Sequence, residues 1–151
     1  MRFFLALVFA TTWLLMPCQA SNLDFGGDFK GEQTFTLEAV VTAYYTPEED
    51  QDEYATGSFK GDVKLNGKGR TFYGGEATVG TIAADPKFLL PGTAVFVPGY
   101  GMGIVHDIGY AIKGRKIDLH MGKGEEALGK AIAWGEKVLD IVIFPARRRG
   151  A

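Results

Sequence analysis

Three aspartates in the C-terminal half of the chain stand among residues that do not favour a charge. Asp85, Asp107 and Asp118 lie in TIAADPKFLLPG, GIVHDIGYAIKG and RKIDLHMG, whereas the acids of residues 48–53 lie among other polar residues. Burial next to Ile, Val or Leu raises the pKa of a carboxyl group, which suits it to general acid–base chemistry. Each aspartate has a structural alternative as a cap or turn residue, and this alternative is strongest for Asp85, which precedes a proline.

Glycines and a lysine surround the second aspartate. Gly109 and Gly114 allow the backbone to turn tightly and to approach a ligand without an intervening Cβ. Lys113 is a candidate for steadying the carboxylates or a developing charge, with a solvated loop lysine as the alternative.

Two histidines lie close to these aspartates. His120 is two residues beyond Asp118, so in a strand both side chains face the same way, whereas His106 faces away from its neighbour Asp107. A metal site needs three or four ligands, and two histidines without a nearby cysteine do not supply them. The sequence therefore predicts no metal and no cofactor.

The elements that must position these residues are mostly short strands. From Phe35 to Ala43 apolar residues alternate with polar ones, which is the period of a half-buried strand. Further strand-like runs, separated by turn signals, cover residues 78–84, 93–97, 103–105, 115–121 and 138–144. Residues 47–62 are acidic and rich in turn formers, which predicts a surface loop, and a helix is predicted over Glu125–Trp134. This pattern favours a small closed barrel.

The first twenty residues have the layout of a secretory signal peptide, with Arg2 before an apolar run and small residues before Ser21. We therefore expect a signal peptide at 1–20, a flexible lead-in at 21–34, a barrel domain at 35–146 and a basic tail at 147–151. The protein is expected to be exported to the periplasm, cell envelope or extracellular space, without stable membrane insertion after cleavage. An uncleaved anchor and a lipoprotein acylated at Cys18 are the alternatives. The net charge of −2 argues against a nucleic-acid partner.

A long ordered pattern then links the chain to a known family. The string TIAADP…LLPGT…VPGYG…VHDIGYAIKGRKIDLHMG resembles the 3D domain, named for three aspartates, of YuiC-type muralytic proteins and of the catalytic barrel of membrane-bound lytic transglycosylase A (MltA). Upstream, VTAYYTPE (41–48) is similar to the opening motif of that barrel. The resemblance runs from about residue 36 to residue 144, and it implies an all-β, six-stranded double-psi β-barrel with one or two short helices.

The resemblance also implies an activity and its residues. A peptidoglycan lytic transglycosylase cleaves the MurNAc-GlcNAc β-1,4 bond and leaves a 1,6-anhydro-MurNAc end, with one aspartate as general acid and base. The matching position is Asp118, with Asp107 as a partner that hydrogen-bonds and tunes it and Asp85 as a third member that shapes the site. Tyr44, Tyr45 and Thr46 match the opening motif and are expected to line the glycan groove, with core packing as the alternative.

The sequence departs from the family pattern at Tyr110, where a second glycine is usual after Gly109. Tyr110 is expected either to stack on a sugar ring or to narrow the cleft. The predicted partners are peptidoglycan glycan strands, and the protein is expected to be a monomer. The alternative functions are a non-catalytic, expansin-like barrel that binds cell-wall polysaccharide, and a polysaccharide hydrolase in which a second carboxylate such as Glu48 serves as the base.

Overall fold

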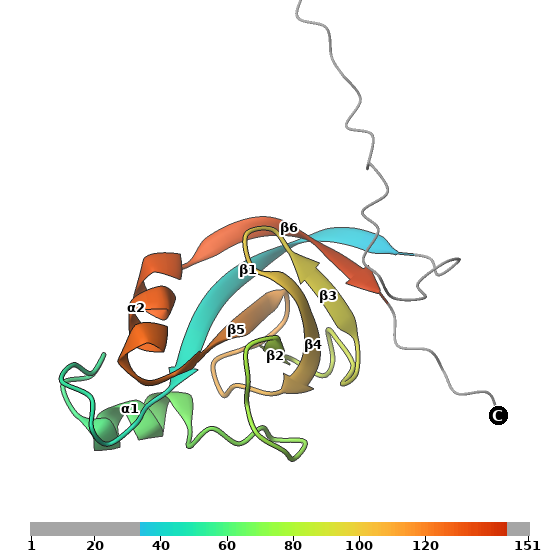
Figure 1. Ribbon diagram of the computed structural model, residues 1–151. Coiled ribbons are helices and arrows are strands. Elements are labelled where there is room, and N and C mark those ends of the chain that lie inside the picture. Colours follow the sequence, from blue (N-terminus) through green and yellow to red (C-terminus); the bar gives the residue numbers. More distant parts are fainter. Residues whose placement is uncertain (1–33, 145–151) are drawn as a thin grey trace, which may run out of the picture. The chain divides into compact units, whose positions relative to one another are not determined.

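The computed structural model describes residues 34–144, which contain six strands and two helices. In chain order the elements are β1 (Phe35–Thr46), α1 (Phe59–Asn66), β2 (Thr81–Ala84), β3 (Ala94–Val97), β4 (Gly101–Asp107), β5 (Lys116–Lys123), α2 (Gly124–Trp134) and β6 (Lys137–Phe144). The strands form a closed barrel in the order β1-β5-β2-β4-β3-β6 (Figure 1). The prediction of an all-β, six-stranded barrel with one or two short helices is confirmed.

Several predicted segments lie outside the described residues. These are the signal peptide at 1–20 with Cys18, the lead-in up to residue 33, and the basic tail at 147–151. Within the part of the chain that the structure describes, none of the helices combines the length and the apolar character needed to cross a membrane.

The first strand organises one side of the barrel. β1 pairs in parallel with β5 and antiparallel with β6, and its register with β5 sets Thr42 opposite Asp118 and Tyr44 opposite His120. The alternation read from the sequence holds in its first part, because Ala39 and Val41 are buried while their neighbours are more exposed. β5 also pairs with β2 on its other edge, so it lies between two strands that are distant from it in the sequence.

The core consists of aliphatic side chains that all the strands contribute. Every residue of β2 is buried, as expected for a short apolar strand that is covered on both faces. The residues at or below 1% exposure include Val41, Ile82, Val95, Val97, Val105, Ile117, Leu119 and Ile141. These side chains pack in one continuous cluster inside the closed barrel.

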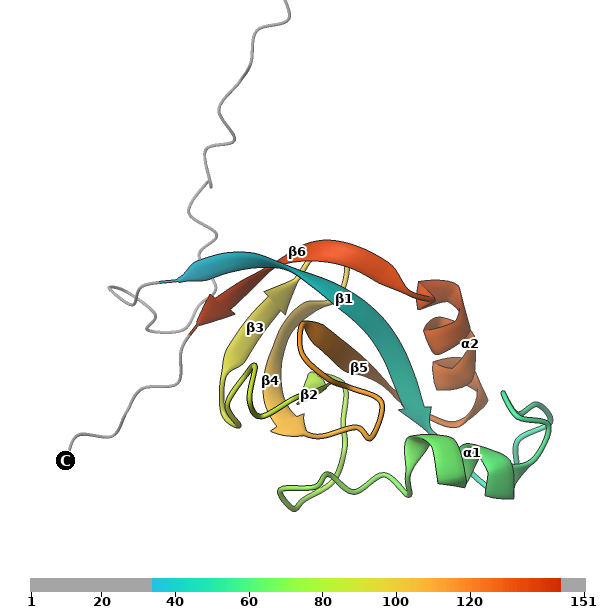
Figure 2. The same cartoon turned by 180° about the vertical axis from the view of Figure 1, so that it is seen from behind.

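The predicted helix at Glu125–Trp134 is confirmed as α2, which begins one residue earlier. Its first turn carries Glu125 and Glu126, where negative charge is favourable. Ala127 and Leu128 are buried against the barrel, and the indole N–H of Trp134 donates to the Val41 carbonyl at 3.3 Å. α2 therefore packs against β1 and β5 on the outside of the barrel (Figure 2).

The prediction that residues 47–62 form only a surface loop is wrong, because α1 begins at Phe59 within this range. Ser58 caps the helix by accepting a hydrogen bond from the Gly61 N–H. The acidic residue Asp62 is fully buried and accepts hydrogen bonds from the amides of Ala55 and Thr56 and from the hydroxyls of Thr56 and Tyr45. An acid-rich composition predicts solvent exposure, but here one acid satisfies four donors and fastens the segment to β1.

Asp62→Ala should lower the free energy of unfolding by about 2–3 kcal/mol, because it leaves buried donors without an acceptor. Chemical denaturation of the variant and the wild type measures this difference. Glu53→Ala, at an exposed position in the same segment, is the control and should change the stability by less than about 0.5 kcal/mol. Equal stability of Asp62→Ala and the wild type would contradict a fastening role.

Candidate active site

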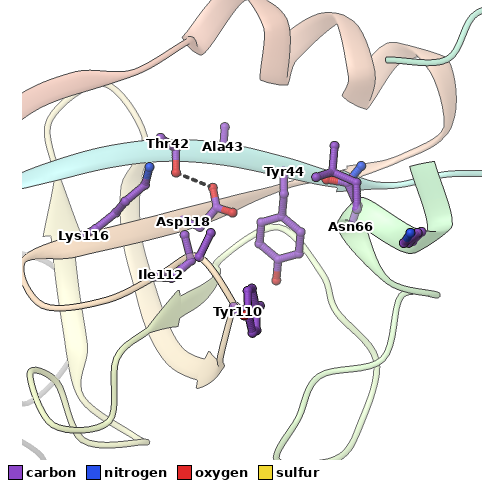
Figure 3. Close-up of a pocket in the computed structure, with 12 residues that line it drawn as sticks. Thr42, Ala43, Tyr44, Asn66, Tyr110, Ile112, Lys116 and Asp118 are labelled. Atoms are coloured by element: carbon purple, nitrogen blue, oxygen red, sulfur yellow. Dashed lines mark hydrogen bonds between the residues drawn. The ribbon is translucent and has the colours of Figure 1, made fainter. Parts of the chain in front are cut away.

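Asp118 lies on β5 with its side chain on the face of the strand opposite the core. Its neighbours Ile117 and Leu119 are completely buried, which fixes the orientation of the strand. The Thr42 hydroxyl donates a hydrogen bond of 2.8 Å to Asp118 Oδ1 (Figure 3). β1 and β5 thus hold the carboxyl in one position.

The surroundings of Asp118 favour its neutral form. Burial raises the pKa of Asp118 from its ordinary value of 3.8 to about 6. The hydrogen bond from Thr42 and the charge of Lys116 oppose this rise, whereas the charge of Asp107 adds to it. A carboxyl of this kind is partly protonated near neutral pH, as a general acid requires.

The carboxyl opens into a pocket of about 390 Å³, which is within the range of small-ligand sites, about 300–1,000 Å³. β1, β5, the end of α1 and the loop after β4 all contribute to its wall (Figure 3). The lining residues are Thr42, Ala43, Tyr44, Lys64, Leu65, Asn66, Gly109, Tyr110, Ala111, Ile112, Lys116 and Asp118.

Asp107, at the end of β4, uses both carboxylate oxygens to hold neighbouring elements. Oδ1 accepts from the backbone N–H groups of Phe72 at 2.8 Å and Ile108 at 2.9 Å. Oδ2 accepts from the Tyr44 hydroxyl at 3.0 Å. The predicted hydrogen bond to Asp118 is not among those of the described residues, so this prediction is corrected. Asp107 acts on Asp118 through its charge.

Asp85 lies at the beginning of a turn and does not line the pocket. Its carboxylate accepts from the N–H of Lys87 at 2.9 Å and from the N–H of Gly114 at 3.0 Å. The hydrogen bond from the Gly114 amide, followed by that from the Lys87 amide, lowers the pKa of Asp85. Asp85 and Gly114 therefore anchor the far end of the loop that walls the pocket, and Lys113 is exposed beside them.

The opening motif splits between two faces of β1. Tyr44 lines the pocket, and burial followed by the charge of Asp107 raises the pKa of its hydroxyl. The next residue, Tyr45, points the other way, and its hydroxyl donates to Asp62. Burial and this hydrogen bond raise the pKa of Tyr45 to about 12. The expectation that Tyr45 lines the groove is therefore corrected, because successive side chains of a strand face opposite sides.

Thr46 is also buried, since its hydroxyl lies 2.9 Å from Nε2 of the buried His120. The His120 ring packs edge-on against the ring of Tyr44 at 4.9 Å between centroids. Burial lowers the pKa of His120, so this neutral ring supports Tyr44 from behind. Thr46 thus acts through His120 instead of lining the pocket.

Gly109 and Tyr110 lie where the loop after β4 meets the pocket. A Cβ on Gly109 would come within 2.4 Å of the Ile112 side chain, so the close turn requires glycine. The Tyr110 side chain is fully exposed at the mouth of the pocket. It is therefore placed to contact a ligand and does not fill the interior.

Several residues that line the pocket were not among the predicted site residues. Thr42 and Lys116 are each two residues from a predicted site residue on the same strand, so the strand period would have found them. Lys64, Leu65 and Asn66 come from α1, and no sequence signal placed this helix beside the pocket. Within residues 34–144, no group of three or more His, Cys, Asp or Glu side chains is arranged to hold a metal ion.

Residues 80–144 match the model of a protein family, the 3D domain. The matched segment makes up less than half of the chain. It includes Asp85, Asp107 and Asp118, whereas β1 and α1, which complete the pocket, precede it.

Two relatives in Bacillus subtilis strain 168 share part of this sequence. YabE, named for cell wall shaping, is 42% identical over 63 residues, and YocH, named a cell wall-binding protein, is 37% identical over 63 residues. Each match covers 42% of this chain, but it spans only 14% of YabE and 21% of YocH. The chain therefore spans about a fifth or less of the length of each of these relatives.

Solved structures of lytic transglycosylases also resemble the barrel. Escherichia coli MltA with bound chitohexaose matches at a TM-score of 0.43 and 20% identity, over 52% of this chain and 28% of MltA. LtgG of Burkholderia pseudomallei matches at a TM-score of 0.41 and 25% identity, over 51% of this chain and 27% of LtgG.

Thr42→Val should raise the pKa of Asp118 above about 6, by about one pH unit, because the variant removes a hydrogen bond that favours the carboxylate. NMR titration of the side-chain carboxyl carbon measures this pKa. Thr36→Val, at an exposed position of the same strand, should leave it unchanged. A pKa that does not move in Thr42→Val would show that the hydrogen bond does not act on the carboxylate.

Asp118→Asn should stabilise the protein at pH 7, by at most about 3 kcal/mol at 1.36 kcal/mol per pH unit. A pKa that is higher in the folded state means that the folded protein binds the proton more tightly than the unfolded chain does. The free energy of unfolding of the wild type therefore falls as the pH rises from about 4 to about 6. The advantage of the variant should therefore disappear below about pH 4. Denaturation at both pH values measures this, with Asp140→Asn on the exposed face of β6 as the control. An equal gain at both pH values would contradict the raised pKa.

Proposed function

We propose that this protein is exported to the cell envelope and acts there as a peptidoglycan lytic transglycosylase. The observation that carries the proposal is a single carboxyl, Asp118, whose pKa is raised by burial at the wall of an open pocket. The 3D domain and the cell-wall names of YabE and YocH support a cell-wall substrate. The substrate would be the glycan strand of peptidoglycan, bound by a monomer.

In the proposed reaction Asp118 acts first as an acid and then as a base. The protonated carboxyl gives its proton to the glycosidic oxygen between MurNAc and GlcNAc, and the C1–O bond breaks. The resulting carboxylate accepts the proton of the MurNAc C6 hydroxyl as that oxygen bonds to C1. The products are a GlcNAc end with a free hydroxyl and a 1,6-anhydro-MurNAc end, and Asp118 is protonated again. No water is consumed, so a second carboxylate is not required, in contrast to most glycosidases.

The neighbouring residues have distinct proposed roles. Thr42 orients the carboxyl of Asp118, and Lys116 and Asp107 adjust its pKa in opposite directions. Tyr44, Gly109 and Tyr110 would form the sugar-binding wall. Asp85, through the amide of Gly114, would position the loop that carries this wall. Glu48 is not among the residues lining this pocket, which favours the one-carboxylate mechanism over hydrolysis.

A second candidate function is binding of cell-wall polysaccharide without catalysis. The name of YocH, a cell wall-binding protein, favours it. The two functions differ in the need for Asp118, because a binding surface does not depend on a proton donor.

Incubation of the purified chain with peptidoglycan, followed by mass spectrometry of the fragments, separates the candidates. A transglycosylase yields anhydromuropeptides, whereas a hydrolase yields hydrated reducing ends. Intact sacculi that retain the protein indicate binding alone, and this outcome would overturn the proposed activity.

Asp118→Asn should reduce turnover by at least about 10²-fold, since general acid–base assistance is worth about 10²–10⁴. The variant should keep the wild-type circular dichroism spectrum and bind glycan. Asp140→Asn should retain full activity. In the wild type, kcat/KM should fall about tenfold per pH unit above about pH 6, because the protonated form of Asp118 is lost. Full activity of Asp118→Asn would remove the mechanism.

A further inference from the structure

Two aromatic side chains outside the pocket are held in water next to the candidate active site. Phe72 is 67% exposed and Tyr73 is 39% exposed, and their rings meet edge-on at 5.1 Å between centroids. Leaving rings in solvent forgoes the free energy of burying them. They belong to the turn of residues 71–75, which we call the aromatic turn and which passes below the end of β4 in both views of the barrel (Figures 1 and 2).

The aromatic turn has a defined conformation. The Thr71 hydroxyl donates to the Gly74 carbonyl at 2.7 Å, and the Gly74 N–H donates to the Thr71 carbonyl at 3.2 Å. Gly74 and Gly75 both have φ near 95°, which glycine adopts without strain. An isolated antiparallel β-bridge between the backbones of Arg70 and Glu76 closes the turn. The two rings are therefore presented on a preformed support, which reduces the entropy lost on binding.

Asp107 connects the aromatic turn to the pocket. Its Oδ1 accepts from the Phe72 N–H at 2.8 Å, while its Oδ2 accepts from the hydroxyl of Tyr44, which lines the pocket with Asp118. A second link joins the Thr71 hydroxyl to Nδ1 of His106 at 3.1 Å. One carboxylate thus fixes the position of the exposed rings relative to the pocket.

We propose that the aromatic turn is a further sugar-binding subsite, in which the Phe72 ring stacks on the face of a pyranose ring and the Tyr73 ring, which lies edge-on to Phe72, contacts the side of the same sugar. This proposal rests on the proposed function, since the same glycan would extend from the pocket across Asp107 to the turn. Uncharged aromatic faces suit the C–H face of a sugar and do not suit an anion. The affinity for a glycan would therefore depend on its length, because only an oligosaccharide that extends beyond the pocket reaches the aromatic turn.

The test is calorimetric binding of chitohexaose and of chitobiose to the full chain carrying Asp118→Asn, which prevents turnover. Adding Phe72→Ala and Tyr73→Ala together should weaken chitohexaose binding on the order of tenfold, from the loss of two aromatic contacts. Chitobiose binding should not change, because the shorter sugar occupies the pocket alone. Phe35→Ala removes a comparably exposed ring at the start of β1 and is the matched control, with no expected effect on either ligand.

Three results would overturn the subsite: unchanged chitohexaose affinity in the double variant, an equal loss for both sugars, or no chitohexaose binding by the parent. The circular dichroism spectrum of the double variant must match that of the parent. A second double variant, Phe72→Leu with Tyr73→Leu, keeps apolar bulk but removes the flat aromatic faces. It should lose affinity for chitohexaose and keep its affinity for chitobiose. The proposed activity fails separately, if wild-type protein releases no anhydromuropeptides. Length-dependent binding without such products would support the subsite and contradict the proposed activity, so the protein would bind glycan without cleaving it.

Discussion

The parallel pairing of β1 with β5 is the constraint on which the candidate site depends. It sets Thr42 opposite Asp118 and Tyr44 opposite His120. The register of this one strand pair therefore positions the acid, its hydrogen-bond donor and part of the pocket wall. A shift by one residue would turn Asp118 toward the core. Ile117 and Leu119 prevent this, because both are completely buried and would have to enter solvent. The hydrophobic core therefore fixes the chemistry of the opposite face of β5.

The site balances effects that act on one proton. Burial disfavours the carboxylate of Asp118, and Asp107 strengthens this effect, whereas Thr42 and Lys116 restore part of the stability of the charged form. Lys116 is itself paired with Glu136 at 3.2 Å, which limits its pull on the aspartate. The result is a pKa between that of an ordinary surface acid and neutrality. Such a group can both give and accept a proton without a large free-energy cost in either direction.

The three aspartates in the segment that matches the 3D domain model have different roles according to where they lie. Asp118 faces the pocket, Asp107 ties the aromatic turn and Tyr44 together, and Asp85 caps a turn and holds the Gly114 end of the pocket loop. Asp107 and Asp85 accept hydrogen bonds from backbone N–H groups. This is the structural role that the sequence left open for an acid in a turn. A shared pattern of acids in a sequence thus includes residues that organise the site and have no part in the proposed reaction.

The strands and α2 follow from local sequence patterns, and the prediction located them closely. Alternation of apolar residues marks β1, and apolar runs between glycines and prolines mark the shorter strands. α1 was missed because the acids before it predict solvent exposure, and the fourfold hydrogen bonding of Asp62 is not visible in local composition. Tyr45 was misplaced because a motif does not state which face of the strand each residue occupies.

By itself, the sequence determined which segments become strands and that Asp118 stands between two core residues. These properties depend on the period of the side chains along one strand, which a few neighbouring residues specify. Only the tertiary structure decided that Thr42, Asp118 and the end of α1 share a pocket, and that Asp107 accepts hydrogen bonds from the aromatic turn and Tyr44 instead of forming one with Asp118. These contacts join residues 35 to 76 positions apart, and barrel closure brings them together through a strand order that differs from the order along the chain.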